Sequence, residues 1–317
     1  MRQLAEPLRR SLEEQRPLLL DGGLATRLEA MGHRLDSRLW SAELLHSHPD
    51  AVLEAHLSYL EAGADCITGA SYQATREGFG ELGLDDFEAD TLIAKSVELA
   101  HEARRRYRER AGARGRDLLV AASIGPYGAA LHDGSEYRGD YHVPEQTLWD
   151  FHRRRLQLLD ECDADLLACE TIPDHTEARV LRKLLEFAST PAWVSFQCRD
   201  GRHIADGTPV RDMAALFASH DGVLAVGVNC TAPQHVPSLI AECRAGAPDK
   251  TIVVYPNSGE RYDAESKSWA GTATPVEFGS AAREWLAAGA RWIGGCCRVG
   301  PDHIAAMRAT LDAPEKE

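Results

Sequence analysis

Short apolar runs alternate along the chain with longer stretches in which apolar residues recur at helical spacing. In the stretch from 86 to 110, for example, Ile93, Val97 and Ala100 occupy positions i, i+4 and i+7 of one predicted helix face. The predicted strands are Leu18–Asp21, Ala64–Ala70, Leu118–Ile124, Leu166–Glu170, Trp193–Gln197, Val223–Val228, Ile252–Tyr255 and Trp292–Gly294. The predicted helices are Ala51–Ala62, Asp86–Arg110, Leu148–Glu161, His175–Ala188, Val210–Ser219, Gln234–Arg244, Pro275–Ala288 and Asp302–Leu311.

Strands that are each paired with a helix are typical of a (β/α)8 barrel, in which a parallel sheet closes on itself. An open, doubly wound sheet is the main alternative. That fold usually carries a glycine-rich phosphate loop after its first strand, and Asp21-Gly22-Gly23-Leu24 does not match such a loop. Ala-Gly-Ala ends a predicted helix at both 62–64 and 288–290, where glycine suits the turn out of a helix. Because the chain has no internal repeat or linker, we expect residues 1–317 to form a single domain.

The chain is acidic, with 35 Lys and Arg against 49 Asp and Glu and a net charge of −14. This balance argues against a nucleic-acid-binding protein, which usually has a basic face. The N-terminal residues 1–17 are polar and lack the apolar core of a signal peptide, and no apolar run is long enough to span a bilayer. We therefore expect a cytoplasmic protein with its eight cysteines as free thiols or metal ligands. The sequence leaves its oligomeric state open between a monomer and a small homo-oligomer.

Three cysteines lie where predicted strands end. Cys296 and Cys297 follow the last strand, and Cys230 follows the sixth. Active sites of (β/α)8 barrels form at the carboxyl ends of the strands, and alternate strands share a layer, so Cys230 can meet the cysteine pair. Three thiolates form a zinc site whose fourth position is free, as a catalytic zinc requires. The alternative is that they are buried thiols that pack as small apolar side chains, as we predict for Cys66, Cys162, Cys169, Cys198 and Cys243.

Asp21 and Glu170 end the first and fourth predicted strands. An unpaired buried carboxylate is costly, so Glu170 needs a cationic or hydrogen-bonding partner, and the ammonium group of a substrate would serve. For Asp21 there is an alternative to a binding role, because aspartate favours turns and often ends a strand for that reason. Residues 125–142 form a long segment after the third strand, rich in tyrosines and carboxylates. Its composition suits a cationic ligand, with a solvated surface loop as the alternative.

Several of these motifs resemble the zinc-dependent homocysteine S-methyltransferases. The resemblance extends over about 18–311 and leaves 1–17 and 312–317 as terminal extensions. Within this family, the motifs most resemble the branch that uses S-methylmethionine or S-adenosylmethionine as methyl donor. The motifs are Leu20-Asp21-Gly22-Gly23, Ser71-Tyr72-Gln73-Ala74-Thr75, Gly125-Pro126-Tyr127-Gly128, the run from Asp133 to Tyr141, Ala168-Cys169-Glu170-Thr171, Val228-Asn229-Cys230, the run from Tyr255 to Glu260, and Gly294-Gly295-Cys296-Cys297-Arg298.

The resemblance implies a (β/α)8 barrel that binds one Zn²⁺ per chain and the amino acid homocysteine. Gly69 lies where relatives often have threonine, so a side-chain contact to substrate from that position is lost. The implied residues are Cys230, Cys296 and Cys297 for zinc, Asp21 and Glu170 for the amino group of homocysteine, Ser71, Tyr72 and Asn229 as further substrate-binding candidates, and Tyr127, Glu136, Tyr141 and Asn257 as donor-binding candidates.

The implied reaction is attack of a zinc-bound homocysteine thiolate on the methyl group of a sulfonium donor, which gives methionine. A free thiol has a pKa of about 8.5 and is mostly protonated at neutral pH, whereas zinc holds the sulfur as a thiolate. The positive sulfur of the donor already activates its methyl group, so no general base is required. The alternatives are a betaine-dependent homocysteine or selenocysteine methyltransferase, and a non-catalytic zinc- or thiol-binding protein in which a protein group fills the fourth position.

Overall fold

The structure is a computed structural model that describes residues 4–35, 37–111, 116–259, 261–263, 268–270 and 274–313. Residues 1–3 and 314–317, at the ends of the two predicted terminal extensions, lie outside the described residues. Glu260, the last residue of one of the family motifs, also lies outside them.

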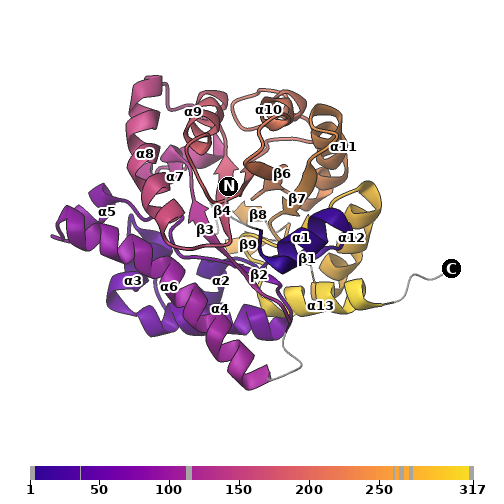
Figure 1. Cartoon of the computed structure of the whole chain (residues 1–317), viewed down its shortest axis with the longest axis horizontal. Coiled ribbons are helices and arrows are strands. Elements are labelled where there is room, and N and C mark those ends of the chain that lie inside the picture. The colour runs from indigo at the N-terminus through magenta and orange to yellow at the C-terminus, as the bar shows by residue number, and fades with distance from the viewer. Residues whose placement is uncertain are drawn as a thin grey trace.

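Eight parallel strands form one sheet that curves into a barrel (Figure 1). Their order is β1, β10, β7, β6, β5, β4, β3, β2, and the two edges meet where Leu20 bridges Cys66. The fold is therefore the predicted (β/α)8 barrel and not an open doubly wound sheet. The strands are β1 (Leu18–Leu19), β2 (Cys66–Thr68), β3 (Leu119–Ile124), β4 (Leu166–Ile172), β5 (Ala192–Phe196), β6 (Val223–Asn229), β7 (Thr251–Tyr255) and β10 (Trp292–Ile293).

The predicted helices are all present and surround the barrel (Figure 1). Their bounds are α4 (Pro49–Ala62), α6 (Asp86–Ala111), α8 (Glu145–Glu161), α9 (His175–Leu185), α10 (Val210–Phe217), α11 (Val236–Gly246), α12 (Pro275–Ala288) and α13 (Pro301–Asp312). Gly63 and Gly289 end α4 and α12 with φ of 119° and 113°, as the Ala-Gly-Ala motifs predicted. Within the described residues no helix has both the length and the apolar character needed to cross a membrane.

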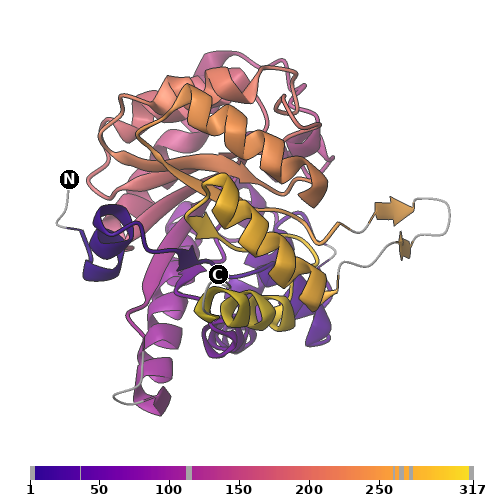
Figure 2. The ribbon, with the colours of Figure 1, turned by 90° about the vertical axis from the view of Figure 1, so that its right-hand side faces the viewer.

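Several short elements were not predicted from the sequence. The helices α1 (Glu6–Glu13), α2 (Leu24–Ala30), α3 (Leu44–Ser47), α5 (Arg76–Gly80) and α7 (Tyr127–Leu131) have eight residues or fewer, too few for the helical repeat to stand out. The 3₁₀ helices are η1 (Trp40–Glu43), η3 (Ser135–Tyr137) and η4 (Pro233–His235). Strands β8 (Arg261–Asp263) and β9 (Ser268–Ala270) pair as an antiparallel hairpin that projects from the barrel (Figure 2).

The N-terminal helix closes one end of the barrel. Leu8 of α1 is fully buried in the apolar cluster that fills the barrel interior, and Trp292 Nε1 donates a hydrogen bond to Ser11 Oγ at 2.9 Å. Further along the barrel, Trp193 packs edge-on against Trp292 and Tyr255. The interior is thus filled from the amino ends of the strands, and the carboxyl ends remain for a site.

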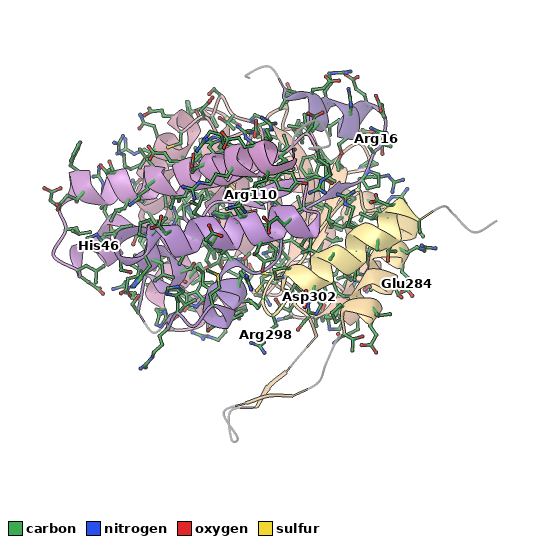
Figure 3. The ribbon with its side chains drawn as sticks, turned by 90° about the horizontal axis from the view of Figure 1, so that it is seen from below. Arg16, His46, Arg110, Glu284, Arg298 and Asp302 are labelled. Atoms are coloured by element: carbon green, nitrogen blue, oxygen red, sulfur yellow. The ribbon has the colours of Figure 1, made fainter. Side chains whose placement is uncertain are left out.

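Labelled side chains mark the two ends of the barrel. Arg298, which follows β10, lies on the same side of the molecule as the projecting hairpin, whereas Arg16, which precedes β1, lies on the opposite side (Figure 3). The loops that follow the strands therefore gather on the hairpin side.

Candidate active site

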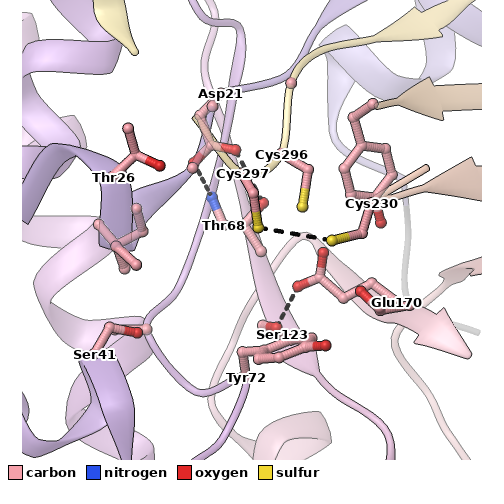
Figure 4. Close-up of a pocket in the computed structure, with 18 of the residues that line it drawn as sticks. Asp21, Thr26, Ser41, Thr68, Tyr72, Ser123, Glu170, Cys230, Cys296 and Cys297 are labelled. Carbon is pink, nitrogen blue, oxygen red and sulfur yellow. Dashed lines mark hydrogen bonds between the residues drawn. The ribbon is translucent and has the colours of Figure 1, made fainter. Parts of the chain in front are cut away.

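A cavity opens among the loops at the carboxyl ends of the strands. Its wall contains Asp21 after β1, Glu170 on β4, Cys230 after β6, and Cys296 and Cys297 after β10. Figure 4 shows the three sulfur atoms close to the two carboxylates. The structure thus brings together five residues predicted from four different strands.

The three cysteines are spaced for a metal ion. Their Sγ atoms all lie within 4.8 Å of one another, and those of Cys230 and Cys297 are 3.7 Å apart. A tetrahedral zinc ion with Zn–S bonds of about 2.3 Å separates its sulfur ligands by about 3.8 Å. The donor set and its spacing therefore fit a zinc ion.

Backbone hydrogen bonds hold the two cysteine loops against the end of β7. The Cys230 N–H donates to the Tyr255 carbonyl at 3.2 Å and the Cys296 N–H to the Pro256 carbonyl at 2.8 Å, while the Ser258 N–H donates to the Cys297 carbonyl at 3.1 Å. Cys230 has a φ of 49°, so the chain turns sharply out of β6 at this residue. The strand end between them therefore fixes the distance from Cys230 to the cysteine pair.

The cluster also lowers the pKa of one thiol. Hydrogen bonds from Cys230 and Cys296 hold the pKa of Cys297 well below its usual value. The Tyr137 hydroxyl, from η3, lies 3.7 Å from Cys230 Sγ at the cavity wall. The pKa values of Cys230 and Cys296 lie above the usual value of a thiol, so an ion that binds all three sulfurs as thiolates displaces the protons of these two.

The two carboxylates are buried in the same cavity wall as the cysteines. Asp21 is 6% exposed, and its Oδ2 accepts from the Thr68 N–H at 2.8 Å. Glu170 is 9% exposed and accepts from the Ser123 hydroxyl (Figure 4). Burial raises the pKa of Asp21 to about 8 and that of Glu170 to about 7. Among the described residues neither carboxylate forms a salt bridge, so a cationic group of a ligand would stabilise the ionised forms.

Of the further substrate-binding candidates, only Tyr72 lines the cavity. The Ser71 hydroxyl is buried and donates to the Ser123 carbonyl at 2.8 Å. Asn229 is also buried; its Oδ1 accepts from the Thr171 N–H and its Nδ2 donates to Thr171 Oγ1, both at 2.7 Å. Asn229 thereby holds Thr171 at a φ of 63°, where β4 is irregular and continues past its predicted end at Glu170.

The donor-binding candidates fall into two groups. Glu136 Oε2 and Asn257 Oδ1 are buried without a hydrogen-bond partner, and burial raises the pKa of Glu136. None of the four is among the residues that line the cavity, and the Tyr127 N–H and the Tyr141 hydroxyl donate to Glu177, outside it. Gly69 lies at the cavity wall, where an added Cβ would come within 3.2 Å of the Ser96 carbonyl oxygen.

The cavity also contains residues that the sequence did not indicate. Thr68 binds Asp21, and Ser123 binds Glu170. The Thr26 hydroxyl, which accepts from the Arg298 N–H at 2.9 Å, and Ser41 complete the wall on the side of α2 and η1. Thr68 and Ser123 lie within predicted strands, where alternation toward the interior could have indicated them; Thr26 and Ser41 lie in short elements without a pattern.

A (β/α)8 barrel with a thiol cluster and buried carboxylates at the carboxyl ends of its strands defines a barrel enzyme whose cysteines could bind a metal. The chain belongs to the homocysteine S-methyltransferase family, whose sequence profile matches residues 18–311. The family predicted from the sequence motifs is thereby confirmed, and with it an S-methyltransferase enzyme.

Individual relatives are similar over nearly their whole length. The homocysteine S-methyltransferase YbgG of Bacillus subtilis is 48% identical over 306 residues, which cover 96% of this chain and 97% of the relative. The metallated form of the homocysteine methyltransferase MmuM from Escherichia coli superposes with a TM-score of 0.85 at 46% identity, over 96% of this chain and 99% of that one. A selenocysteine Se-methyltransferase of Brassica oleracea is 44% identical, over 92% of this chain and 88% of the relative.

Proposed function

We propose that the enzyme transfers a methyl group from a sulfonium donor, S-methylmethionine or S-adenosylmethionine, to the sulfur of homocysteine, which gives methionine. The observation that carries the proposal is one cavity whose wall holds both three clustered sulfurs and two buried carboxylates. A thiol-bearing amino acid offers one group to each set: a sulfur for the metal and an ammonium for the acids.

Cys230, Cys296 and Cys297 would hold one zinc ion, because three thiolates at tetrahedral spacing leave the fourth position to a ligand. When bound, zinc supplies an open coordination position and keeps a sulfur ligand deprotonated near neutral pH. In the described ranges no fourth Cys, His or carboxylate joins the cluster. This favours the enzyme over a closed zinc-storage protein.

Asp21 and Glu170 orient homocysteine by its ammonium group. Their buried carboxyl groups have pKa values of about 8 and about 7, so they ionise readily when a cation arrives. Tyr72 completes the wall beside them. Ser71 contributes indirectly, by its hydrogen bond to the backbone of Ser123 in β3. Asn229 does so by its hydrogen bond to the backbone of Thr171, the residue after Glu170.

The donor binds where Glu136 and Asn257 leave buried oxygens without partners. A carboxylate there attracts the positive sulfonium, whose charge disappears as the methyl group leaves. The carbon–sulfur bond of the donor breaks while the new bond to the homocysteine sulfur forms, and the donor sulfur departs as a neutral thioether. Holding the two sulfurs in line can supply roughly 7–11 kcal/mol of the barrier, and no general base takes part.

The compartment that suits this reaction is the cytoplasm, because a reducing environment keeps cysteines free to bind a metal. The relative that methylates selenocysteine supports a second acceptor for the same site, a selenol in place of a thiol.

The test is methionine formation by zinc-loaded, reduced enzyme from homocysteine and methyl-labelled S-methylmethionine, S-adenosylmethionine or betaine, each alone. We expect label in methionine from a sulfonium donor and none from betaine. Transfer from betaine would refute the proposed donor class. No transfer from any donor, with zinc bound one to one, would refute the methyltransferase and favour a zinc-binding protein. Selenocysteine, offered as acceptor in the same assay, tests the second candidate.

A further inference from the structure

One carboxylate outside the cavity holds both ends of a segment that reaches the cysteine cluster. The segment, residues 127–141, follows β3 and contains α7 and η3. Glu177, in the first turn of α9, is fully buried. Its Oε1 accepts from the Tyr127 N–H at 2.6 Å and its Oε2 from the Tyr141 hydroxyl at 2.8 Å. The first and the last residue of the segment are therefore attached to the two oxygens of a single side chain.

Glu177 has further hydrogen-bond partners around it. Asp174 caps α9 by accepting from the Glu177 N–H at 2.8 Å, and the start of a helix favours a negative side chain. His152, also fully buried, lies 2.7 Å from Glu177 Oε1 through its Nε2. Burial lowers the pKa of His152, so its ring is neutral, and Nε2 carries the hydrogen because a carboxylate oxygen accepts. A buried carboxylate with this many partners has one well-defined position.

Between these two anchors the segment reaches the site. The Tyr137 hydroxyl is 3.7 Å from Cys230 Sγ, and the neighbouring Glu136 has a buried oxygen without a partner. The segment is tightly packed within itself, because a Cβ at Gly128 would come within 2.6 Å of both Glu136 N and the Tyr141 ring. Movement at the anchors therefore displaces the residues that face the cysteines.

We propose that Glu177 is a positioning residue for methyl transfer. By fixing Tyr127 and Tyr141 it sets the place of Glu136 and Tyr137 relative to the three cysteines, and with it the binding of the methyl donor. This inference rests on the proposed function. It assigns Tyr127 and Tyr141 to the anchor and not to direct contact with the donor. In Figure 1 the three elements involved, α7, α8 and α9, lie together beside β3 and β4.

Two variants test the proposal in the zinc-loaded enzyme. Glu177→Gln keeps the shape of the side chain and removes its charge, and Tyr141→Phe removes only one of the hydrogen bonds. With S-methylmethionine as donor, we expect its KM to rise roughly tenfold in either variant, the equivalent of one charge-assisted hydrogen bond. Zinc content and the Kd of homocysteine should stay within about a factor of two. The matched control is Glu186→Gln. Glu186 directly follows α9 and forms an exposed ion pair with Arg182, so its replacement should leave the donor KM, the zinc content and the Kd of homocysteine unchanged.

Hydrogen exchange gives a second readout that does not depend on activity. Amides of residues 127–141 should exchange faster in both variants, while those of β4 keep their wild-type rates. Unchanged donor KM and unchanged exchange would overturn the proposal, as would a parallel loss of homocysteine binding, which would show a general role in folding. If Glu177→Gln does not fold, Tyr141→Phe decides. If the wild type transfers no methyl group, the proposed function fails. The exchange rates then still show whether Glu177 holds residues 127–141 in place.

Discussion

Replacing Glu170 by glutamine isolates the contribution of one buried charge to homocysteine binding. The side chain keeps its size and its contact with Ser123, because a glutamine oxygen can accept the same hydrogen bond. What is lost is the attraction between a carboxylate that is 9% exposed and the ammonium group of the substrate. A hydrogen bond to a charged group contributes about 1.5–3 kcal/mol, so the Kd of homocysteine should rise roughly 10- to 150-fold.

The assay is calorimetric titration of homocysteine into zinc-loaded protein, with zinc content measured on the same samples. Glu170→Asp keeps the charge but shortens its reach, and we expect it to recover part of the lost affinity. Both variants should bind zinc one to one, because Glu170 lies outside the sulfur cluster. An unchanged Kd in Glu170→Gln would refute the assignment of this carboxylate to the ammonium group.

Three further predictions concern the metal and the stability of the barrel. Cys297→Ser should remove zinc and activity together while the barrel stays folded; elemental analysis and circular dichroism check this, and a fully active variant without zinc would contradict the mechanism. His56 is buried with both ring nitrogens unpaired, and burial lowers its pKa to about 4. The unfolded chain takes up a proton near pH 6.5 that the folded one does not, so stability falls as pH falls, by about 2 kcal/mol from pH 7 to pH 5. Urea unfolding should show this loss in the wild type and a smaller one in His56→Leu. Gly227→Ala places a Cβ within 1.7 Å of the Val253 carbonyl oxygen and should cost about 3 kcal/mol or more, whereas Gly80→Ala meets nothing within 4 Å and should cost nothing; equal stabilities for the two glycine variants would refute the packing argument.

The strands of the barrel could be predicted because each is a buried run with a clear end. Cys230, Asp21 and Glu170 follow or end such runs, and the geometry of a closed parallel sheet brings them to one place. Strand β4 was predicted to end at Glu170, but it continues to Ile172 because Asn229, from β6, binds the backbone of Thr171. The end of β4 thus depends on a contact between two strands, and it cannot be predicted from the sequence of either strand alone.

The segment after β3 shows the same limit more strongly. Its tyrosines indicated a binding loop, yet the Tyr127 backbone N–H and the Tyr141 hydroxyl bind Glu177, which lies 50 and 36 positions further along the chain. Composition reveals which groups a segment offers, while the partner that orients them comes from a distant helix. The short helix α7 and the turn η3 within it also escaped prediction, since neither is long enough to show a period.

Closure of the barrel has a consequence for the order in which the protein assembles. The last strand, β10, pairs with β1 and packs its Trp292 on α1, so the barrel is complete only when the two ends of the chain have met. The same strand leads directly into Cys296 and Cys297, while Cys230 arrives with β6. The pairing that joins the two ends of the chain is therefore also the one that brings the cysteine pair to Cys230. A metal ion bound by all three sulfurs would therefore stabilise the closed barrel over the unfolded chain, and its supply would affect the yield of folded protein.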